Sequence, residues 1–212
     1  MDKITRADLS NMFSCVAAVM TEKSDELGAM DAMLGDGDLG LTMKKGFCAI
    51  PEIINEISET DISKTLMKAG MKLSSIIPST MGFLMGSGLM AGGKAISGSE
   101  AIGAAEYAVF LRGFADGIVK RGKCAPGDRT VLDAINAAAE RAEICLQHTP
   151  DATLSEVAAS AEEGAAAGME ATRGMEPKFG KAAVHKKAAI GTVDQGAYAG
   201  LCLISAIHRF IG

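Results

Sequence analysis

Three carboxylates stand close together in the segment Asp31-Ala32-Met33-Leu34-Gly35-Asp36-Gly37-Asp38-Leu39-Gly40. We expect Asp31 in the last turn of the first helix, where negative charge opposes the helix dipole. Such a cluster is costly unless a cation neutralises it, and oxygen ligands suit Mg²⁺ or Ca²⁺. No Glu stands at the twelfth position, so the loop is not an EF-hand. The segment predicts a metal site, most naturally Mg²⁺ that also binds nucleotide phosphates; the alternative is a solvated acidic turn that caps the next helix.

A second candidate is the glycine-rich stretch Pro78-Ser79-Thr80-Met81-Gly82, which continues through Gly86, Gly88, Gly92 and Gly93. Backbone N–H groups of such a stretch can bind phosphates. It lacks the Gly-Lys-Ser/Thr ending of a P-loop. The alternative is a helix whose glycines allow close packing against neighbouring helices.

A third candidate is the basic segment 171–187, in which Glu176 is the only acid among Arg173, Lys178, Lys181, Lys186 and Lys187. It can hold an anion or act as a mobile lid, and the alternative is a solvated loop. The histidines do not have metal-site spacing, so we expect no catalytic role for His148, His185 or His208.

The composition is that of an ordinary soluble globular protein: 212 residues, 48% hydrophobic and 22% charged. We expect one domain over residues 1–212. A net charge of −5 argues against nucleic-acid binding. Residues 82–93 are too short and glycine-rich to span a membrane, and the N-terminus lacks a signal peptide. Five scattered cysteines without a Cys-x-x-Cys pair predict free thiols in the cytoplasm.

The elements that must position these residues are helices, because apolar residues recur at helical spacing and alternating strand-like runs are absent. The first helix follows a cap at Thr5-Arg6-Ala7-Asp8, and Asp128 is expected to cap another. The expected helices cover residues 9–20, 62–76, 107–121, 131–146, 154–169 and 197–210, with shorter ones over 44–57 and 84–96. The prediction is an all-α bundle of about eight helices. If the bundle is antiparallel, glycine-rich loops at alternate connections meet at one end.

Taken together, the motifs resemble those of a known family. Gly35-Asp36-Gly37-Asp38-Leu39-Gly40 matches the pattern Gly-Asp-x-Asp-x-Gly, with Asp31 at the expected place before it. Gly122-Lys123 and Gly127-Asp128-Arg129-Thr130 match a Gly-Lys-x-x-x-Gly-Asp-Lys-Thr segment, and residues 175–196 correspond to two further loops. The chain thus resembles the L subunit, the nucleotide-binding half, of bacterial dihydroxyacetone kinases over nearly its whole length.

This resemblance implies an all-α, single-domain antiparallel barrel of eight helices with the nucleotide bound at one end. It also implies a phosphoryl-transfer site that binds ATP or ADP with two Mg²⁺ ions held by Asp31, Asp36 and Asp38. Ser79 and Thr80 are expected beside the phosphates, Gly122 and Val131 near the adenine, and Lys178 in the place of a phosphate-contacting arginine. Thr130 and Asp194 belong to the same nucleotide site. The implied partners are a separate ketose-binding K subunit and a phosphoprotein of the phosphotransferase system, in a homodimer or hetero-oligomer.

The sequence also departs from the family pattern. Met81 stands where the family has a serine, and Gly191-Thr192-Val193-Asp194-Gln195-Gly196-Ala197 replaces Gly-His-x-Asp-Pro-Gly-Ala. These changes suggest a divergent paralogue, which acts on dihydroxyacetone or on another short ketose such as erythrulose. The alternatives are a non-catalytic nucleotide-binding subunit that regulates or scaffolds a partner, and a barrel that holds a lipid.

Overall fold

The computed structural model describes the backbone of residues 1–212 and every side chain except those of residues 185–187. The α-helices are α1 (Leu9–Glu22), α2 (Ser24–Ala32), α3 (Leu39–Glu56), α4 (Ile62–Ile76), α5 (Thr80–Ala95), α6 (Ala104–Gly122), α7 (Val131–His148), α8 (Leu154–Ala171), α9 (Lys186–Ala189) and α10 (Gln195–Ile211). Three short 3₁₀ helices and one bridge between Ile4 and Ile102 complete the described chain. The all-α prediction is confirmed.

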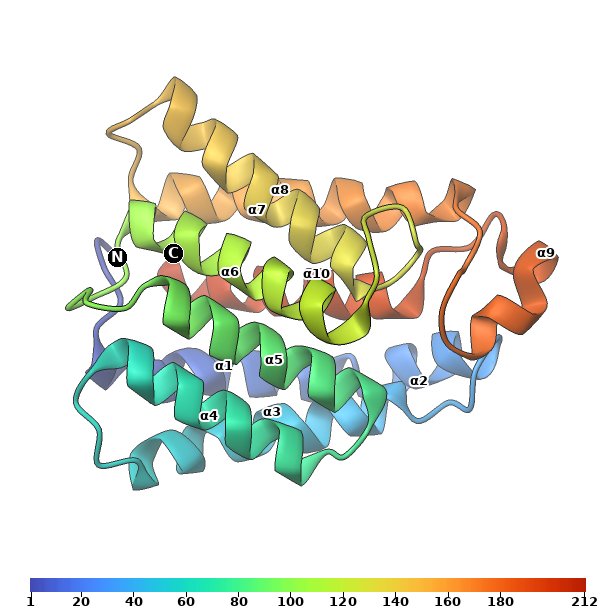
Figure 1. The fold of residues 1–212 in the computed structure, drawn as a ribbon, viewed down its shortest axis with the longest axis horizontal. Helices are drawn as coiled ribbons and strands as arrows, with labels where there is room; N and C mark the ends of the chain where they lie inside the picture. The colour runs from blue at the N-terminus through green and yellow to red at the C-terminus, as the bar shows by residue number, and fades with distance from the viewer.

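Eight of the helices form a closed ring. Each packs against the next in the order α1, α3, α4, α5, α6, α7, α8 and α10, and α10 returns to α1. The connections alternate between two ends of the bundle, so the neighbours run antiparallel (Figure 1). The links α2–α3, α4–α5, α6–α7 and α8–α10 share one end, and both chain termini lie at the other. The glycine-rich loops are therefore gathered at one end, as expected.

Several of the helix starts are fixed by side chains that accept a hydrogen bond from the first turn. Five such caps are Asp61, Ser79, Thr130, Thr153 and Asp194. The cap predicted at Asp128 is wrong: Thr130 caps α7, and the Asp128 carboxylate instead accepts the Ala125 N–H and pairs with Lys178. Two loop residues separate Asp128 from the helix, which is why sequence proximity alone misplaced the cap.

The first expected helix is in fact two. The chain breaks at Lys23, and Asp31 lies in the last turn of α2 rather than of α1. The helices expected over 44–57 and 84–96 begin earlier, at Leu39 and Thr80. In both cases glycines near the start dilute the apolar periodicity, while packing against neighbouring helices keeps the segment helical.

The glycines of α5 serve close packing. A Cβ on Gly88 would lie 2.5 Å from the Phe114 ring, and one on Gly86 would lie 2.6 Å from the Gly70 carbonyl oxygen. Contacts this short cannot be made by any other residue without moving a helix. The alternative interpretation of this stretch, a glycine-faced helix, is therefore correct for its body.

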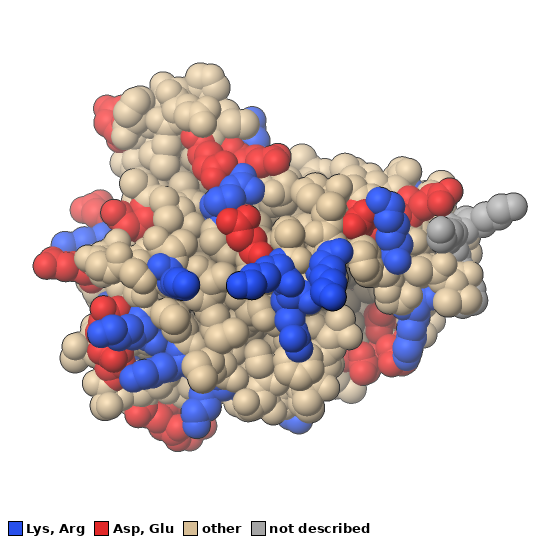
Figure 2. All heavy atoms as spheres, viewed as in Figure 1, with Lys and Arg blue, Asp and Glu red and all other residues tan. Residues whose placement is uncertain are grey.

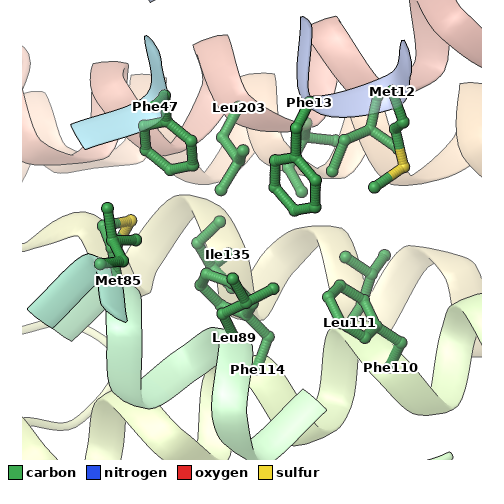
Figure 3. Close-up of a pocket in the computed structure, with 13 residues that line it drawn as sticks. Met12, Phe13, Phe47, Met85, Leu89, Phe110, Leu111, Phe114, Ile135 and Leu203 are labelled. Carbon is green, nitrogen blue, oxygen red and sulfur yellow. The ribbon is translucent and has the colours of Figure 1, made fainter. Parts of the chain in front are cut away.

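The interior of the ring is filled. Side chains from α1, α3 and α10, among them Phe13, Phe47 and Leu203, point toward Leu89 and Phe114 on the opposite helices (Figure 3). The cavity that remains among them has a volume of about 20 Å³, which is room for about one water molecule. A lipid chain does not fit into this interior as it stands.

The face seen in Figure 2 is mostly uncharged, with a row of basic side chains across its middle and acidic side chains above this row and toward the edges. None of the described helices is long and apolar enough to cross a membrane. The charged residues of the candidate site lie at the end of the bundle where the glycine-rich loops meet.

Candidate functional site

A cavity of about 330 Å³ opens at the end of the bundle that carries the glycine-rich loops. All four connections at that end contribute to its wall. Eight of the ten residues proposed from the sequence line it: Asp31, Asp36, Asp38, Ser79, Thr80, Thr130, Val131 and Asp194. The fold therefore brings most of the residues predicted from the sequence to one cavity.

Four helices begin at the wall of this cavity. Leu39, Thr80, Val131 and Gln195 line it, and they are the first residues of α3, α5, α7 and α10. The unpaired N–H groups and the dipole of a helix make its N-terminus attractive to anions. Four such ends around one cavity create a positive potential suited to a phosphorylated ligand.

Negative charge at the same cavity comes from Asp31 and from the acidic loop between α2 and α3, residues 33–38. Asp31 is buried, and its carboxylate accepts the backbone N–H groups of Gly37 at 2.9 Å and Leu39 at 3.4 Å. The Gln195 side-chain amide donates to the same carboxylate at 3.1 Å. These contacts fix the orientation of Asp31 and tie the loop to the start of α10.

Glycines allow this loop its compact path. A Cβ on Gly35 would lie 2.4 Å from a carboxylate oxygen of Asp31, and Gly37 has a φ of +77°, which disfavours other residues. The chain consequently folds back so that the three carboxylates face one another. Asp31, Asp36 and Asp38 can each present one oxygen within 4.8 Å of the others.

This donor set fits a hard divalent cation. It supplies three carboxylates, two of them exposed, and Mg²⁺ or Ca²⁺ prefers such ligands. Asp31, which is anchored by backbone N–H groups, would be the fixed ligand, and the two exposed residues would complete the set.

The ammonium group of Lys181 reaches this cluster and pairs with Asp36. That contact lowers the pKa of the Asp36 carboxyl below its ordinary value, so the carboxylate is ionised well into the acid range. Lys181 lines the cavity beside Phe179 and Gly180. Lys181 thus places a positive charge at the mouth of the cavity, next to the expected metal ligands.

The structure does not bring Lys178 or Gly122 to the cavity wall. The Lys178 ammonium group pairs with Asp128, and its backbone N–H donates to the Asp128 carbonyl oxygen at 3.2 Å. Gly122 lies behind Leu84, which does line the cavity; a Cβ on Gly122 would lie 3.0 Å from the Leu84 side chain. Lys178 holds a loop in place, and Lys181 takes the position at the cavity.

Arg129 and Gln195 were not proposed for the site from the sequence, and Lys181 was named only as one of the cations of the basic segment 171–187. Arg129 and Gln195 lie next to the proposed residues Thr130 and Asp194, and all three line the cavity. Only the folded arrangement shows which neighbours turn inward. Two of the histidines do not line the cavity: His148 contacts the Ile144 carbonyl oxygen, and His208 pairs with Glu162. The side chain of His185 is outside the described residues.

Asp194 combines burial with a capping role. Its carboxylate accepts the Ala197 N–H at 2.9 Å. Burial raises its pKa to about 6, because the loss of hydration outweighs the favourable N–H groups and the nearby Arg129 guanidinium. The folded protein therefore binds a proton here that the unfolded chain has already lost between about pH 4 and pH 6.

The raised pKa of Asp194 should make the free energy of unfolding depend on pH. As the pH rises from about 4 to about 6, the charged Asp194 should lower the free energy of unfolding, and the loss should persist above pH 6. Asp194→Asn keeps an oxygen for the cap, so relative to the wild type it should gain about 2–3 kcal/mol between pH 4 and pH 7. Urea unfolding of both proteins in the presence of a chelator measures this; parallel pH profiles would contradict it.

A scan against protein families matches residues 33–209 to the DAK2 domain, more than half of the chain. The chain belongs to the DAK2 domain family. This confirms the resemblance to dihydroxyacetone kinase L subunits that the motifs indicated. The match begins just after α2 and ends within the last turn of α10. The loop between α2 and α3 and the helices from α3 to α9 therefore lie inside the DAK2 domain, and Asp31 lies two residues before it.

Two relatives are similar to this chain over most of its length. The chain is 29% identical to the ADP-binding subunit DhaL of the PEP-dependent dihydroxyacetone kinase of Escherichia coli, over 92% of this chain and 91% of that one. It is 30% identical to the D-erythrulose kinase of Mycolicibacterium smegmatis, over 89% of this chain but only 33% of that protein.

The DAK2 fold also matches a solved structure. The crystal structure of the dihydroxyacetone kinase of C. freundii superposes with a TM-score of 0.70 at 21% identity, over 99% of this chain and 36% of that one. A second structure of that enzyme, in complex with AMP-PNP and Mg²⁺, gives the same TM-score at 22% identity over 96% of this chain and 34% of that one. At this identity the match supports the fold, and the site is argued from its own residues.

Proposed function

We propose that this DAK2 protein is the nucleotide-binding, phosphoryl-transfer subunit of a short-ketose kinase. The observation that carries the proposal is one cavity in which three clustered carboxylates face four helix N-termini. Carboxylates that hold a metal and N–H groups that hold phosphates are the two parts that phosphoryl transfer by positioning requires. The names of the relatives, a dihydroxyacetone kinase subunit and an erythrulose kinase, support the reaction class.

Asp31, Asp36 and Asp38 would hold Mg²⁺, and we propose two ions, as in the family pattern. Bound metal would neutralise phosphate charge in the transition state. The chain's own part is to fix Asp31 through Gly37 and Gln195, and to present the carboxylates of Asp36 and Asp38 to the cavity. No nucleophile from this chain is needed, because the acceptor hydroxyl belongs to the sugar.

The nucleotide would lie between the acidic loop and the helix starts. Ser79 and Thr80 stand at the N-terminus of α5 beside the phosphates, with Thr130 and Asp194 at the starts of α7 and α10. Val131 and Leu84 form an apolar part of the wall, backed by Gly122, where the adenine would pack. ATP and ADP both fit this description. The relatives are named for ADP binding in one case and crystallised with an ATP analogue in another.

We propose that Lys181, and not Lys178, contacts the phosphates. Lys181→Met removes a cation at the cavity and leaves Asp36 uncompensated, so ADP affinity should fall about five- to tenfold. Lys178→Met removes the same charge from a side chain that pairs with Asp128 away from the cavity wall. Its ADP affinity should stay within about twofold of the wild type. Calorimetric titrations compare the two; equal losses would contradict this assignment.

The partner that we propose is a ketose-binding K subunit, which docks on the end that carries the cavity. Met33 and Leu41 are large apolar residues beside the acidic loop, and they are 62% and 68% exposed. Exposed apolar side chains at the rim of a site are typical of interaction surfaces. A phosphotransferase-system phosphoprotein and a homodimer or hetero-oligomer complete the proposed assembly. The five free thiols support a cytoplasmic location.

Removal of the two exposed apolar side chains tests whether the K subunit docks on this rim. Met33→Ser combined with Leu41→Ser should raise the K-subunit concentration needed for half-maximal turnover about tenfold or more, while ADP affinity stays unchanged. Met71→Ser, a change at another residue that is 60% exposed, serves as the control. An unchanged requirement for the K subunit in the double variant would show that this rim is not the docking surface.

The function itself is tested by adding a dihydroxyacetone- or erythrulose-binding K subunit with ATP, or with ADP and a phosphotransferase-system donor. Formation of a ketose phosphate that depends on this chain supports the proposal. One feature favours the second candidate, a non-catalytic nucleotide-binding subunit: the apolar Met81 lines the cavity at the start of α5. Tight nucleotide binding without turnover under every combination would favour that alternative.

A further inference from the structure

Arg129 is an unusual residue for a cavity wall. It lines the cavity, yet its side chain is only 2% exposed. Its backbone has a φ of +60°, in the left-handed region that non-glycine residues rarely adopt. A conformation this rare persists when the surrounding structure enforces it, and such positions concentrate at functional sites. The surrounding fold thus enforces the backbone conformation from which the Arg129 side chain extends.

Only part of the guanidinium is used within the described protein. Nη2 donates to the Thr192 carbonyl oxygen at 2.8 Å and to the Thr192 hydroxyl at 3.0 Å. Nε and Nη1 are buried and have no hydrogen-bond partner among the described residues. The nearby Asp194 carboxylate already accepts the Ala197 N–H. Arginine has five N–H donors. The N–H groups of Nε and Nη1 in Arg129 therefore remain available to a ligand.

The surroundings indicate which ligand would use them. The first residues of α7 and α10, Val131 and Gln195, lie on the same wall, and Lys181 lies at the mouth. Every one of these features favours an anion. The planar fork of arginine matches phosphate oxygens better than a lysine ammonium does.

We propose that Arg129 is a phosphate-binding residue, whose Nε and Nη1 donate to oxygens of the bound nucleotide's phosphate chain. This inference rests on the proposed function and adds a residue to it. Because the two nitrogens are buried beneath the cavity surface, the contact needs a small rotation of the guanidinium. The link from Nη2 to Thr192 gives Arg129 a second effect: it ties the α6–α7 loop to the segment before α10.

The experiment separates phosphate binding from a purely structural role. Mg–ADP and adenosine are titrated calorimetrically into the wild-type chain and into the Arg129→Gln and Arg129→Lys variants. Arg141→Gln is the control, since it removes the same charge from an exposed side chain that pairs with Glu163 on the α7–α8 face. Thermal unfolding of each protein reports any loss of fold.

Arg129→Gln should weaken ADP binding about 10- to 100-fold, the usual effect of losing charged hydrogen bonds, and leave adenosine binding within about twofold. Arg129→Lys, which keeps the charge, should show a smaller loss and is the variant to compare if Arg129→Gln does not fold. Equal losses for ADP and adenosine would overturn the inference and assign Arg129 a structural role. Unchanged ADP affinity in both variants would also overturn it, whereas a wild type that binds no ADP would overturn the proposed function itself.

Discussion

Asp38→Asn should lower ketose-dependent phosphoryl transfer about 1,000-fold or more, because loss of a metal ligand removes several kcal/mol of transition-state stabilisation. The fold should tolerate the change. Asp38 is exposed and its side chain makes no capping hydrogen bond to α3. Turnover with saturating K subunit, together with thermal unfolding of the chain alone, measures both quantities.

The control is Asp116→Asn, which removes the same charge from an exposed position on α6. It should leave turnover within about twofold, because an isolated exposed charge contributes little. Asp31→Asn offers a contrast: this buried carboxylate accepts two backbone N–H groups and the Gln195 amide. It should therefore lose both activity and stability. Full turnover in the Asp38→Asn protein would show that the carboxylate cluster is an acidic turn without a catalytic role.

Gly40→Ala should destabilise the protein by about 3 kcal/mol or more, at the upper end of overpacking effects. A Cβ there would lie 1.8 Å from the Ser24 carbonyl oxygen and 3.0 Å from the Gly28 nitrogen. Both atoms belong to the backbone of α2, so they cannot move aside as a flexible side chain would. The start of α3 must instead separate from α2, and the acidic loop that joins the two helices must change shape.

For a chain of this length we expect a decrease in Tm of about 6–12 °C, with a loss of Mg²⁺-dependent ADP binding in the fraction that remains folded. Gly174→Ala is the matched control, since nothing lies within 4 Å of its added Cβ. It should change stability by no more than about 0.5 kcal/mol. Equal Tm values for the two variants would mean that the close approach of α2 and α3 is not what holds the loop.

The sequence predicted the helices wherever an apolar stripe ended at a clear signal. Thr153 opens α8 as a capping box, and Gly122 ends α6, both as expected. It did not predict the break at Lys23, because the apolar stripe before it runs on without a proline or glycine at that point. The break is tertiary in origin: Ser24 is buried, and its carbonyl oxygen lies against Gly40.

The candidate site was predictable to the extent that its residues sit in compact motifs. The carboxylates are only seven residues apart at most, from Asp31 to Asp38, so a local fold is enough to bring them together. Lys181 and Gln195 reach the same cluster from more than a hundred residues away. Their inward direction depends on how the α8–α10 connection lies across the bundle end, which side-chain type and spacing do not encode.

The most direct test of the account is whether nucleotide affinity depends on metal. The purified wild-type chain is titrated with ADP by calorimetry, once in excess Mg²⁺ and once in excess chelator, and the Asp38→Asn protein is titrated alongside. ADP should bind the wild-type chain at least about tenfold more tightly with Mg²⁺ than with chelator. This difference should be lost in the Asp38→Asn protein. Equal affinity with and without Mg²⁺, or the absence of ADP binding in both conditions, would contradict the account.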